Sequence, residues 1–278
     1  MQADGVVRLP GGLVLDDGQR IELAELRPLS GREEDWLATH PGVPSAVATT
    51  HLLGSCVVRL GDTKTGPELA RRLLVGDRDY LMLQLRRLTL GERVSAVVGC
   101  PACGERMDVD FRVDDVPVEW RPQVATNHLV TMDAPAAGDA VPPRTVRVRL
   151  PNGADQEAVL GLEASIAVER LLARCLVEPD AALTAKERVA VIEALDRLAP
   201  QVEVELDLTC PECAHELVVP FDTTAFFLDE VRQSNAHLLR EVHTLAFHYH
   251  WSETEILELT RARRRAYLSL LSDALRRD

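Results

Sequence analysis

The sequence is poor in lysine and in aromatic residues, and its acidic side chains outnumber its basic ones. Lys64 and Lys186 are the only lysines among 31 basic residues, and aromatic residues make up 4% of the 278-residue chain. The 44 acidic residues give a formal net charge of −13. Because nucleic-acid binding depends on a surplus of positive charge, this balance argues against a general nucleic-acid binder. With 46% hydrophobic residues, we expect the core to be mainly aliphatic.

Long apolar runs are also missing. No stretch reaches the 18 or more apolar residues of a membrane-spanning helix, and residues 1–12 lack the basic and apolar regions of a secretory signal. We therefore expect a cytoplasmic protein that does not contact a membrane. Since cytoplasmic thiols stay reduced, the six cysteines are interpreted as metal ligands or buried apolar residues rather than disulfides.

An internal repeat is the strongest regularity. Residues 73–111 align without a gap onto residues 183–221 at an offset of 110, with 11 identities in 39 positions. Both copies contain a CPxC motif, which convergent amphipathic patterns would not place at one offset. Farther upstream, residues 52–56 resemble residues 171–175 and residues 30–33 resemble residues 152–155. The sequence therefore predicts that one unit occurs twice.

The predicted fold is α+β: a duplicated unit of helices and a zinc-knuckle hairpin, followed by a helical tail. The expected boundaries are a first unit at 1–121, a linker at 122–143, a second unit at 144–222 and a tail at 223–278. The linker is predicted from its proline, glycine and alanine content. In the first unit we expect a hairpin across the turn at residues 16–18, and helices at 30–36, 47–60 and 80–88. Alternating polarity predicts the knuckle strands at 94–98, 107–111, 202–208 and 217–221.

The two CPxC motifs are the sharpest chemical signal. Cys100 and Cys103, like Cys210 and Cys213, lie at the tip of a predicted hairpin, where a tight turn aims two thiolates at one point. Zinc takes four tetrahedral ligands, so each knuckle supplies half a site. We predict one structural Zn²⁺ shared by all four cysteines. Free thiols, or a ligand set completed by His215, are the alternatives. Four thiolates leave no open position for a substrate.

The other candidate ligands are less specific. Cys56 and Cys175 lie in apolar segments and are predicted to be buried free thiols. His243, His248 and His250 are not spaced by three or four residues, so they do not form a helical ligand pair. No phosphate loop, HExxH or GxSxG motif is present, and we interpret the protein as non-enzymatic. A thiol oxidoreductase would require a redox-active Cys100–Cys103 pair.

The tail contains six of the eleven aromatic residues and an apolar stripe at helical spacing. We predict one amphipathic helix from Phe227 to Tyr249 and a contact surface for a protein partner. The candidate contact residues are Phe227, Val231, Leu238, Val242, Leu245, Tyr249, Trp251 and Tyr267. Deletion of residues 226–278 should then abolish particle assembly and leave a folded, zinc-bound core.

A basic cluster of Arg261, Arg263, Arg264 and Arg265 follows Thr260. We interpret this cluster as a solvated face or a protein contact. The alternative is a zinc-ribbon regulator that binds nucleic acid through residues 261–265, for which salt-dependent DNA affinity would be the test.

Two stretches carry a family resemblance. LVGDRDYLMLQLRRLTLGERV with CPACGERMDVDF, and EVHTLAFHYHWSETEILELTRARRRAYLSLL in the tail, resemble the zinc-knuckle baseplate hub and hub-assembly proteins of T-even-type contractile phage tails. The resemblance implies a role in forming the baseplate, with hub, tube or tape-measure proteins as partners and incorporation into a tail-like particle. The doubled unit suits the contractile injection system branch. The resemblance carries over no catalytic residue, and Ala214 departs from the glycine usual after the knuckle.

Overall fold

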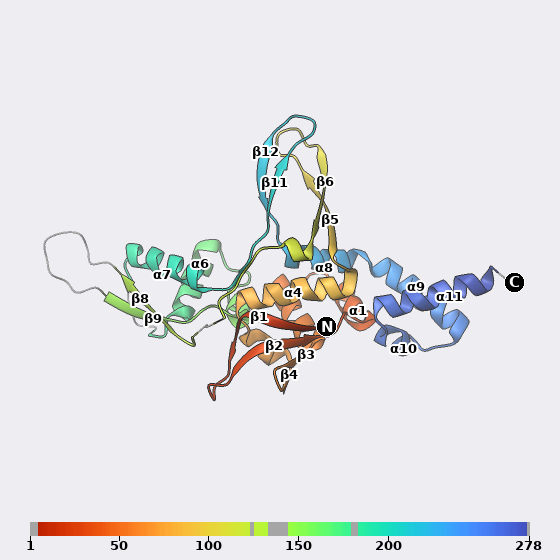
Figure 1. Cartoon of the computed structure of the whole chain (residues 1–278), viewed down its shortest axis with the longest axis horizontal. Helices are drawn as coiled ribbons and strands as arrows, with labels where there is room; N and C mark the ends of the chain where they lie inside the picture. Colours follow the sequence, from red (N-terminus) through yellow and green to blue (C-terminus); the bar gives the residue numbers. More distant parts are fainter. Residues whose placement is uncertain (1–4, 123–124, 133–143, 179–182, 277–278) are drawn as a thin grey trace.

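The computed structural model describes residues 5–122, 125–132, 144–178 and 183–276 of an elongated molecule (Figure 1). Helix accounts for 49% of the structure and strand for 26%. The chain therefore contains both helices and strands, as predicted. Two long hairpins project side by side from a central body (Figure 1). Strands β8 and β9 with helices α6 and α7 lie at one end, and helices α9 to α11 lie at the other.

The first unit begins with a four-stranded antiparallel sheet in the order β1-β2-β3-β4. The predicted hairpin turn is confirmed: the N–H of Gly18 donates to the carbonyl oxygen of Leu15 between the first two strands. Gly18 has φ +82°, which glycine adopts without strain. The strands are β1 (Val6–Val14), β2 (Arg20–Leu26), β3 (Val57–Leu60) and β4 (Thr63–Lys64).

Four helices accompany this sheet, and two of them, α2 and α4, contact its strands directly. A capping box from Ser30 and Glu33 begins α1, as expected, whereas α4 is longer than the predicted helix. The expected helix at 47–60 ends at Cys56, because the next four residues pair with β2 as strand β3. The helices are α1 (Gly31–Thr39), α2 (Ser45–Cys56), α3 (Pro67–Arg72) and α4 (Val75–Leu90). Their core is aliphatic, as the composition predicts.

The predicted second unit also begins with a strand pair that is followed by helices, but it has fewer strands and one helix less before its knuckle hairpin. Strands β8 (His128–Met132) and β9 (Arg144–Val148) form a hairpin, followed by α5 (Gly153–Ala158), α6 (Ala164–Cys175) and α7 (Ala185–Leu198). The linker prediction is therefore wrong for residues 128–132, whose alternating side chains pack against α6 and α7. The rest of the predicted linker lies largely outside the described residues.

The start of α5 is docked on the first unit. The N–H of Gly153 donates to the carbonyl oxygen of Leu73 at 3.1 Å, and a Cβ on Gly153 would lie 2.2 Å from the guanidinium of Arg78. Only glycine fits this approach. Glu157 accepts from the hydroxyl of Thr50 at 2.5 Å and pairs with Arg71 at 2.8 Å.

The knuckle hairpins are β5 (Arg93–Gly99) with β6 (Arg106–Arg112), and β11 (Glu205–Thr209) with β12 (Glu216–Pro220). They have the same register: Ala96 faces Val109, and the residues 110 positions later, Leu206 and Val219, also face each other. Between them run η1 (Val113–Asp115) and the short paired strands β7 (Val118–Glu119) and β10 (Gln201–Val202).

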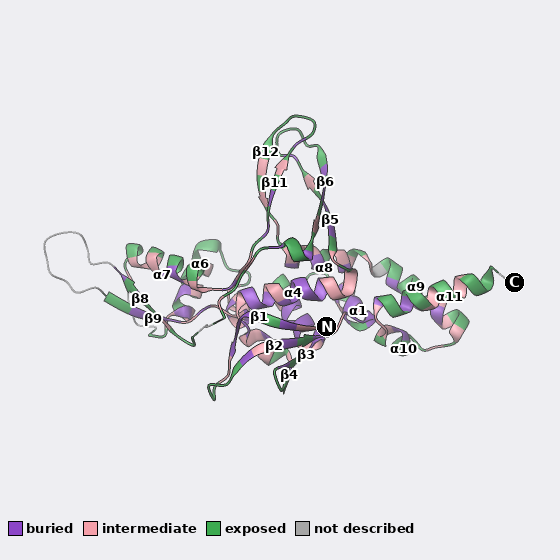
Figure 2. Ribbon diagram, viewed as in Figure 1, coloured by how far each residue is buried: buried purple, intermediate pink, exposed green. Residues whose placement is uncertain are grey.

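Residues 227–249 form two helices, so the prediction of one helix from Phe227 to Tyr249 is wrong, and the described part of the tail has four helices in all. The chain breaks at Ser234, whose hydroxyl donates to the carbonyl oxygen of Glu230. The helices are α8 (Thr223–Gln233), α9 (Asn235–Tyr249), α10 (Glu253–Glu258) and α11 (Arg261–Leu275). Figure 2 shows a largely buried centre around α4 and more exposed outer helices. Among the described helices, none is long and apolar enough to cross a membrane.

Candidate metal centre

The hairpin tips hold each cysteine pair in a tight turn. The N–H of Gly104 donates to the carbonyl oxygen of Cys100, and the N–H of Ala214 donates to that of Cys210, both at 2.9 Å. In addition, the N–H of Cys100 donates to Glu105, and that of Cys210 donates to His215. The same backbone hydrogen bonds therefore shape both knuckles.

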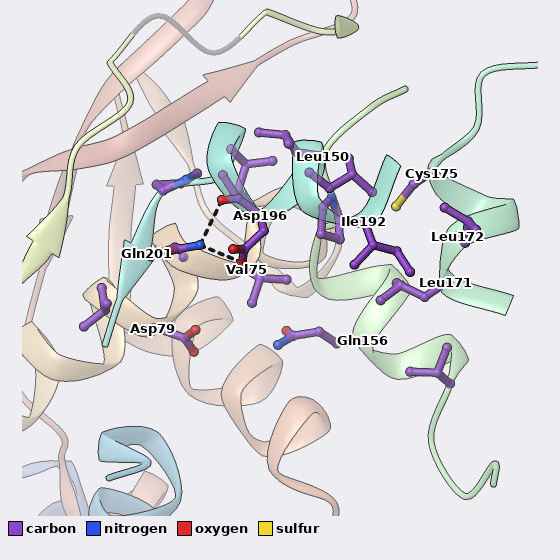
Figure 3. Close-up of a pocket in the computed structure, with 18 of the residues that line it drawn as sticks. Val75, Asp79, Leu150, Gln156, Leu171, Leu172, Cys175, Ile192, Asp196 and Gln201 are labelled. Carbon is purple, nitrogen blue, oxygen red and sulfur yellow. Dashed lines mark hydrogen bonds between the residues drawn. The ribbon is translucent and has the colours of Figure 1, made fainter. Parts of the chain in front are cut away.

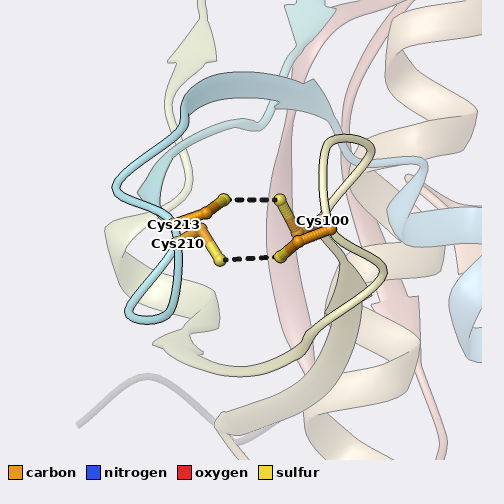
Figure 4. A group of neighbouring side chains, drawn as sticks. Cys100, Cys210 and Cys213 are labelled. Carbon is orange, nitrogen blue, oxygen red and sulfur yellow. Dashed lines mark hydrogen bonds between the residues drawn. The ribbon is translucent and has the colours of Figure 1, made fainter.

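The four knuckle sulfurs converge, as Figure 4 shows. All four lie within 4.8 Å of one another. The Sγ atoms of Cys100 and Cys213 are 3.7 Å apart, and those of Cys103 and Cys210 are 3.6 Å apart. A tetrahedron with zinc–sulfur bonds of ~2.3 Å has edges of about 3.8 Å. The two separations of 3.7 Å and 3.6 Å match this edge, so the four cysteines could together hold one ion. This group contains cysteines from both hairpins and does not include His215.

Each knuckle contributes one buried and one exposed cysteine. Cys100 and Cys210 pack with Met107 beneath the tips, whereas Cys103 and Cys213 are exposed. An ion held here would be shielded from below and would be reached by a chelator from the tip. With four protein ligands, the centre would be structural and closed to substrate.

The two cysteines of the first knuckle differ in the pKa of their thiols. Burial raises the pKa of the Cys100 thiol, but the N–H groups of Cys103 and Ala102 outweigh this and lower it to about 6. The N–H of Glu105 lowers the pKa of Cys103, yet contacts with the neighbouring sulfurs raise it to about 12. The thiolate of Cys100 is therefore favoured over that of Cys103, and a cation beside Cys103 would favour its thiolate, as metal binding does.

The two turns have the same left-handed backbone but different residues. Gly104 has φ +80° and Ala214 has φ +55°. Ala214 therefore has a backbone conformation that is strained for a residue other than glycine. Strain of this kind costs about 1 kcal/mol in a residue with a Cβ.

The remaining cysteines are buried and lie apart from this centre. Cys56 and Cys175 are both 0% exposed, as predicted. Burial raises the pKa of both thiols, that of Cys175 to about 11. Each carbonyl accepts from an arginine N–H, Arg27 in the first unit and Arg149 in the second.

The structure corrects the expected contact surface of the tail. Phe227 and Val231 lie in the main core, at 0% and 1% exposure. Leu238, Val242 and Leu245 are buried with Ile256 between α9, α10 and α11. These five apolar side chains stabilise the chain itself because they meet apolar partners within it. Deletion of residues 226–278 would therefore open the main core, contrary to our expectation.

Three of the proposed contact residues remain partly accessible. Tyr249, Trp251 and Tyr267 form a half-buried aromatic cluster, in which the rings of Tyr249 and Trp251 are stacked with centroids 5.0 Å apart. Phe247, which the sequence analysis did not single out, is 67% exposed beside them in sequence. The three histidines at 243, 248 and 250 are exposed and lie outside the metal-ligand group.

The basic cluster is also partly internal. Arg264 is 0% exposed and binds Glu34 at 3.0 Å and Glu241 at 2.7 Å. Arg261 is buried and pairs with the same Glu34 at 3.1 Å. The expectation of a solvated face is thus wrong for Arg261 and Arg264, whereas Arg263 and Arg265 are exposed. Sequence reasoning missed Glu34 because its arginine partners lie more than 220 residues away.

Comparisons with known proteins place the chain in a family. No curated protein and no solved structure matches it. A family profile described as "T4 bacteriophage base plate protein" matches residues 23–178, which is more than half of the chain. The match begins in β2 and ends after α6, so it covers the knuckle hairpin of β5 and β6 and ends before the second knuckle hairpin of β11 and β12. The chain therefore belongs to the T4 bacteriophage base plate protein family.

Proposed function

We propose that this protein is a non-enzymatic structural or assembly component of the baseplate of a contractile tail-like particle. One Zn²⁺, shared by Cys100, Cys103, Cys210 and Cys213, ties its two hairpins together. The observation that carries the proposal is the convergence of four sulfurs from both hairpins in a chain of the baseplate family. The family match also favours a structural role over a catalytic one.

A duplication accounts for the way two hairpins share one site. The equal register of the hairpins supports it, and so do the matching capping boxes at Ser30 and Asn152. In both units, the arginine before the capping box pairs with the acidic residue of that box: Arg27 with Glu33, and Arg149 with Asp155. Two related knuckles can meet around an approximate twofold axis and complete one tetrahedral set.

The zinc site is tested by metal content. Purified protein should contain about one zinc per chain by elemental analysis, and Cys103→Ser and Cys213→Ser should each lose most of it, since both tips hold the same ion. Cys175→Ser is the matched control, because this buried cysteine lies outside the cluster. Less than half an equivalent in the wild type, or loss in only one of the two knuckle variants, would contradict a shared site.

The partners we propose are the hub, tube or tape-measure proteins, which the tail would contact through Tyr249, Trp251 and Tyr267 together with the exposed Phe247. Aromatic side chains that are only partly buried are typical anchors of interfaces. The proposed location is the cytoplasm and then the particle. If the protein acts only during assembly, it should be missing from purified particles, and analysis of the protein composition of the particles would show this.

The tail contact is tested with a surface substitution. Phe247→Asp should reduce the number of complete particles formed when it replaces the wild type in the producing cell. Leu129→Asp is the matched control, since Leu129 is 70% exposed on β8 at the opposite end of the molecule (Figure 1). Normal assembly by folded Phe247→Asp protein would refute the contact. The nucleic-acid alternative is disfavoured, because two of its four arginines are internal.

A further inference from the structure

The second unit contains an open apolar groove. It lies between α5, α6, α7 and the N-terminal end of α4, has a volume of about 520 Å³ and is lined mainly by aliphatic side chains (Figure 3). Val168 on α6 is 50% exposed, and Ile192 on α7 is 42% exposed. Apolar surface of this extent is unfavourable in water unless something covers it.

The proposed duplication gives this groove a counterpart in the first unit. Val159, Leu171 and Leu195 of the groove correspond to Leu37, Leu52 and Leu85, at offsets of 122, 119 and 110 residues. These three leucines are 0% exposed and belong to the main core. The same three helix faces are therefore covered in one unit and open in the other.

Helix α8 covers the first groove. Its side chains Phe227, Leu228 and Val231 lie in the same core cluster as those leucines, and each is at most 1% exposed. At the rim, Arg86 of α4 pairs with Glu230 of α8 through two bonds of 2.8 Å and 2.9 Å. Helix α8 thus fills the first groove with apolar side chains and forms one ion pair at its rim.

The charge at the rim is reversed in the second unit. The counterpart of Arg86 is Asp196, which is exposed. The charged residues lining this groove, Asp79, Asp196 and Glu203, are all acidic. Burial, followed by the nearby charge of Asp222, raises the pKa of Asp79 to about 6, so a cation beside it would favour its ionised form. The groove is complementary to a helix with a basic residue.

We propose that this groove binds an amphipathic helix of another tail protein. The helix would carry large apolar residues spaced like Phe227, Leu228 and Val231, and a lysine or arginine at the position of Glu230. The proposal rests on the duplication in the proposed function. A second copy of this chain is a poor occupant, because its α8 is already buried and would place Glu230 against Asp196.

Synthetic peptides provide the probe. A labelled peptide with the sequence of residues 222–234 and its Glu230→Lys form are titrated with full-length protein, and binding is followed by fluorescence anisotropy. The Lys peptide should bind the wild type about fivefold more tightly than the Glu peptide, the ratio of an exposed ion pair worth about 1 kcal/mol. Asp196→Arg should reverse this preference.

A matched pair of variants locates the binding. Ile192→Asp should weaken binding of the Lys peptide at least tenfold, whereas Val189→Asp should not, because Val189 is 54% exposed on the same helix but does not line the groove. Failure of both peptides to bind, equal affinities for the wild type, or unchanged binding to Ile192→Asp would overturn the proposal. Zinc content and particle assembly, measured on the same protein, report separately on the proposed function.

Discussion

The two units of the proposed duplication share the register of their knuckle hairpins but differ in how deeply their helices are buried. Helix α4 of the first unit carries nine buried residues, whereas α7, at the corresponding position, buries only Val191 and Ala194. Helices α2 and α6 have the same length, yet α2 buries six residues and α6 two. The helices of the first unit pack with a four-stranded sheet and with α8, whereas α6 and α7 of the second pack with the two-stranded hairpin of β8 and β9. What covers a helix therefore decides how much of it stabilises the fold.

Loss of the metal should give the largest difference in stability between two parts of the molecule, the knuckle hairpins and the helical core of the first unit. Removal of zinc with a chelator should lower amide protection most at the tip ends of β5, β6, β11 and β12, because the tips would keep the apolar contacts of Met107 with Cys100 and Cys210 but lose the ion that we propose joins them. Structural zinc contributes on the order of 10 kcal/mol in small zinc domains. Hydrogen exchange should show that α2 and α4 keep their protection. Equal loss in both regions would mean that the tips and the core unfold as one unit.

The next largest difference is expected at Glu34 and Gln156, which correspond in the proposed duplication and of which only Glu34 is charged. Glu34→Gln should lower the free energy of unfolding by about 3 kcal/mol, because it leaves the buried Arg264 and Arg261 short of a counter-charge. Gln156 is its counterpart in the second unit and lies half-buried in the open groove. Gln156→Glu should change stability by less than about 1 kcal/mol. Denaturant unfolding of both variants measures the difference.

The two units should also differ in pH response. Burial raises the pKa of Asp77 to about 6, although it accepts from the N–H groups of Gly11 and Gly12. Since the folded state then binds this proton more tightly than the unfolded state, stability should rise as pH falls through 6 toward 4. The counterpart Glu187 has its pKa lowered by the N–H and hydroxyl of Thr184, so its contribution has the opposite sign.

Asp77→Asn should remove roughly 3 kcal/mol of this pH dependence, which is the free energy that corresponds to a carboxyl pKa raised to about 6. Unfolding experiments between pH 7 and pH 4.5, with Glu187→Gln as the comparison, provide the test. An unchanged slope in Asp77→Asn would show that Asp77 is not the group responsible.

The smallest contrast concerns the knuckle turns. Ala214→Gly should stabilise the protein by about 1 kcal/mol, and Gly104→Ala should destabilise it by a similar amount, because both positions have positive φ. Thermal unfolding of zinc-loaded protein measures both shifts. Shifts of the same sign would contradict the equivalence of the two turns.

Local sequence was sufficient for features set by short-range chemistry. The capping boxes at Ser30, Thr184 and Ser252, the turn at Gly18 and the strand alternation of the hairpins were all predictable. The grouping of the four cysteines was also predictable, because two CPxC motifs at one offset restrict where the cysteines can lie. Strand β8 was missed, because the proline- and alanine-rich residues that follow it dominate the composition of its segment.

By itself, the sequence determined the kinds of elements, the two knuckles and the aliphatic core, since these depend on residues within about ten positions of one another. Only the tertiary structure decided that the tail stripe packs inward, that Arg261 and Arg264 meet Glu34, and that α8 fills one groove and leaves its counterpart open. An amphipathic pattern predicts only that a helix buries one of its sides. Which surface it meets depends on contacts between distant segments, whose energies appear only once the chain is folded.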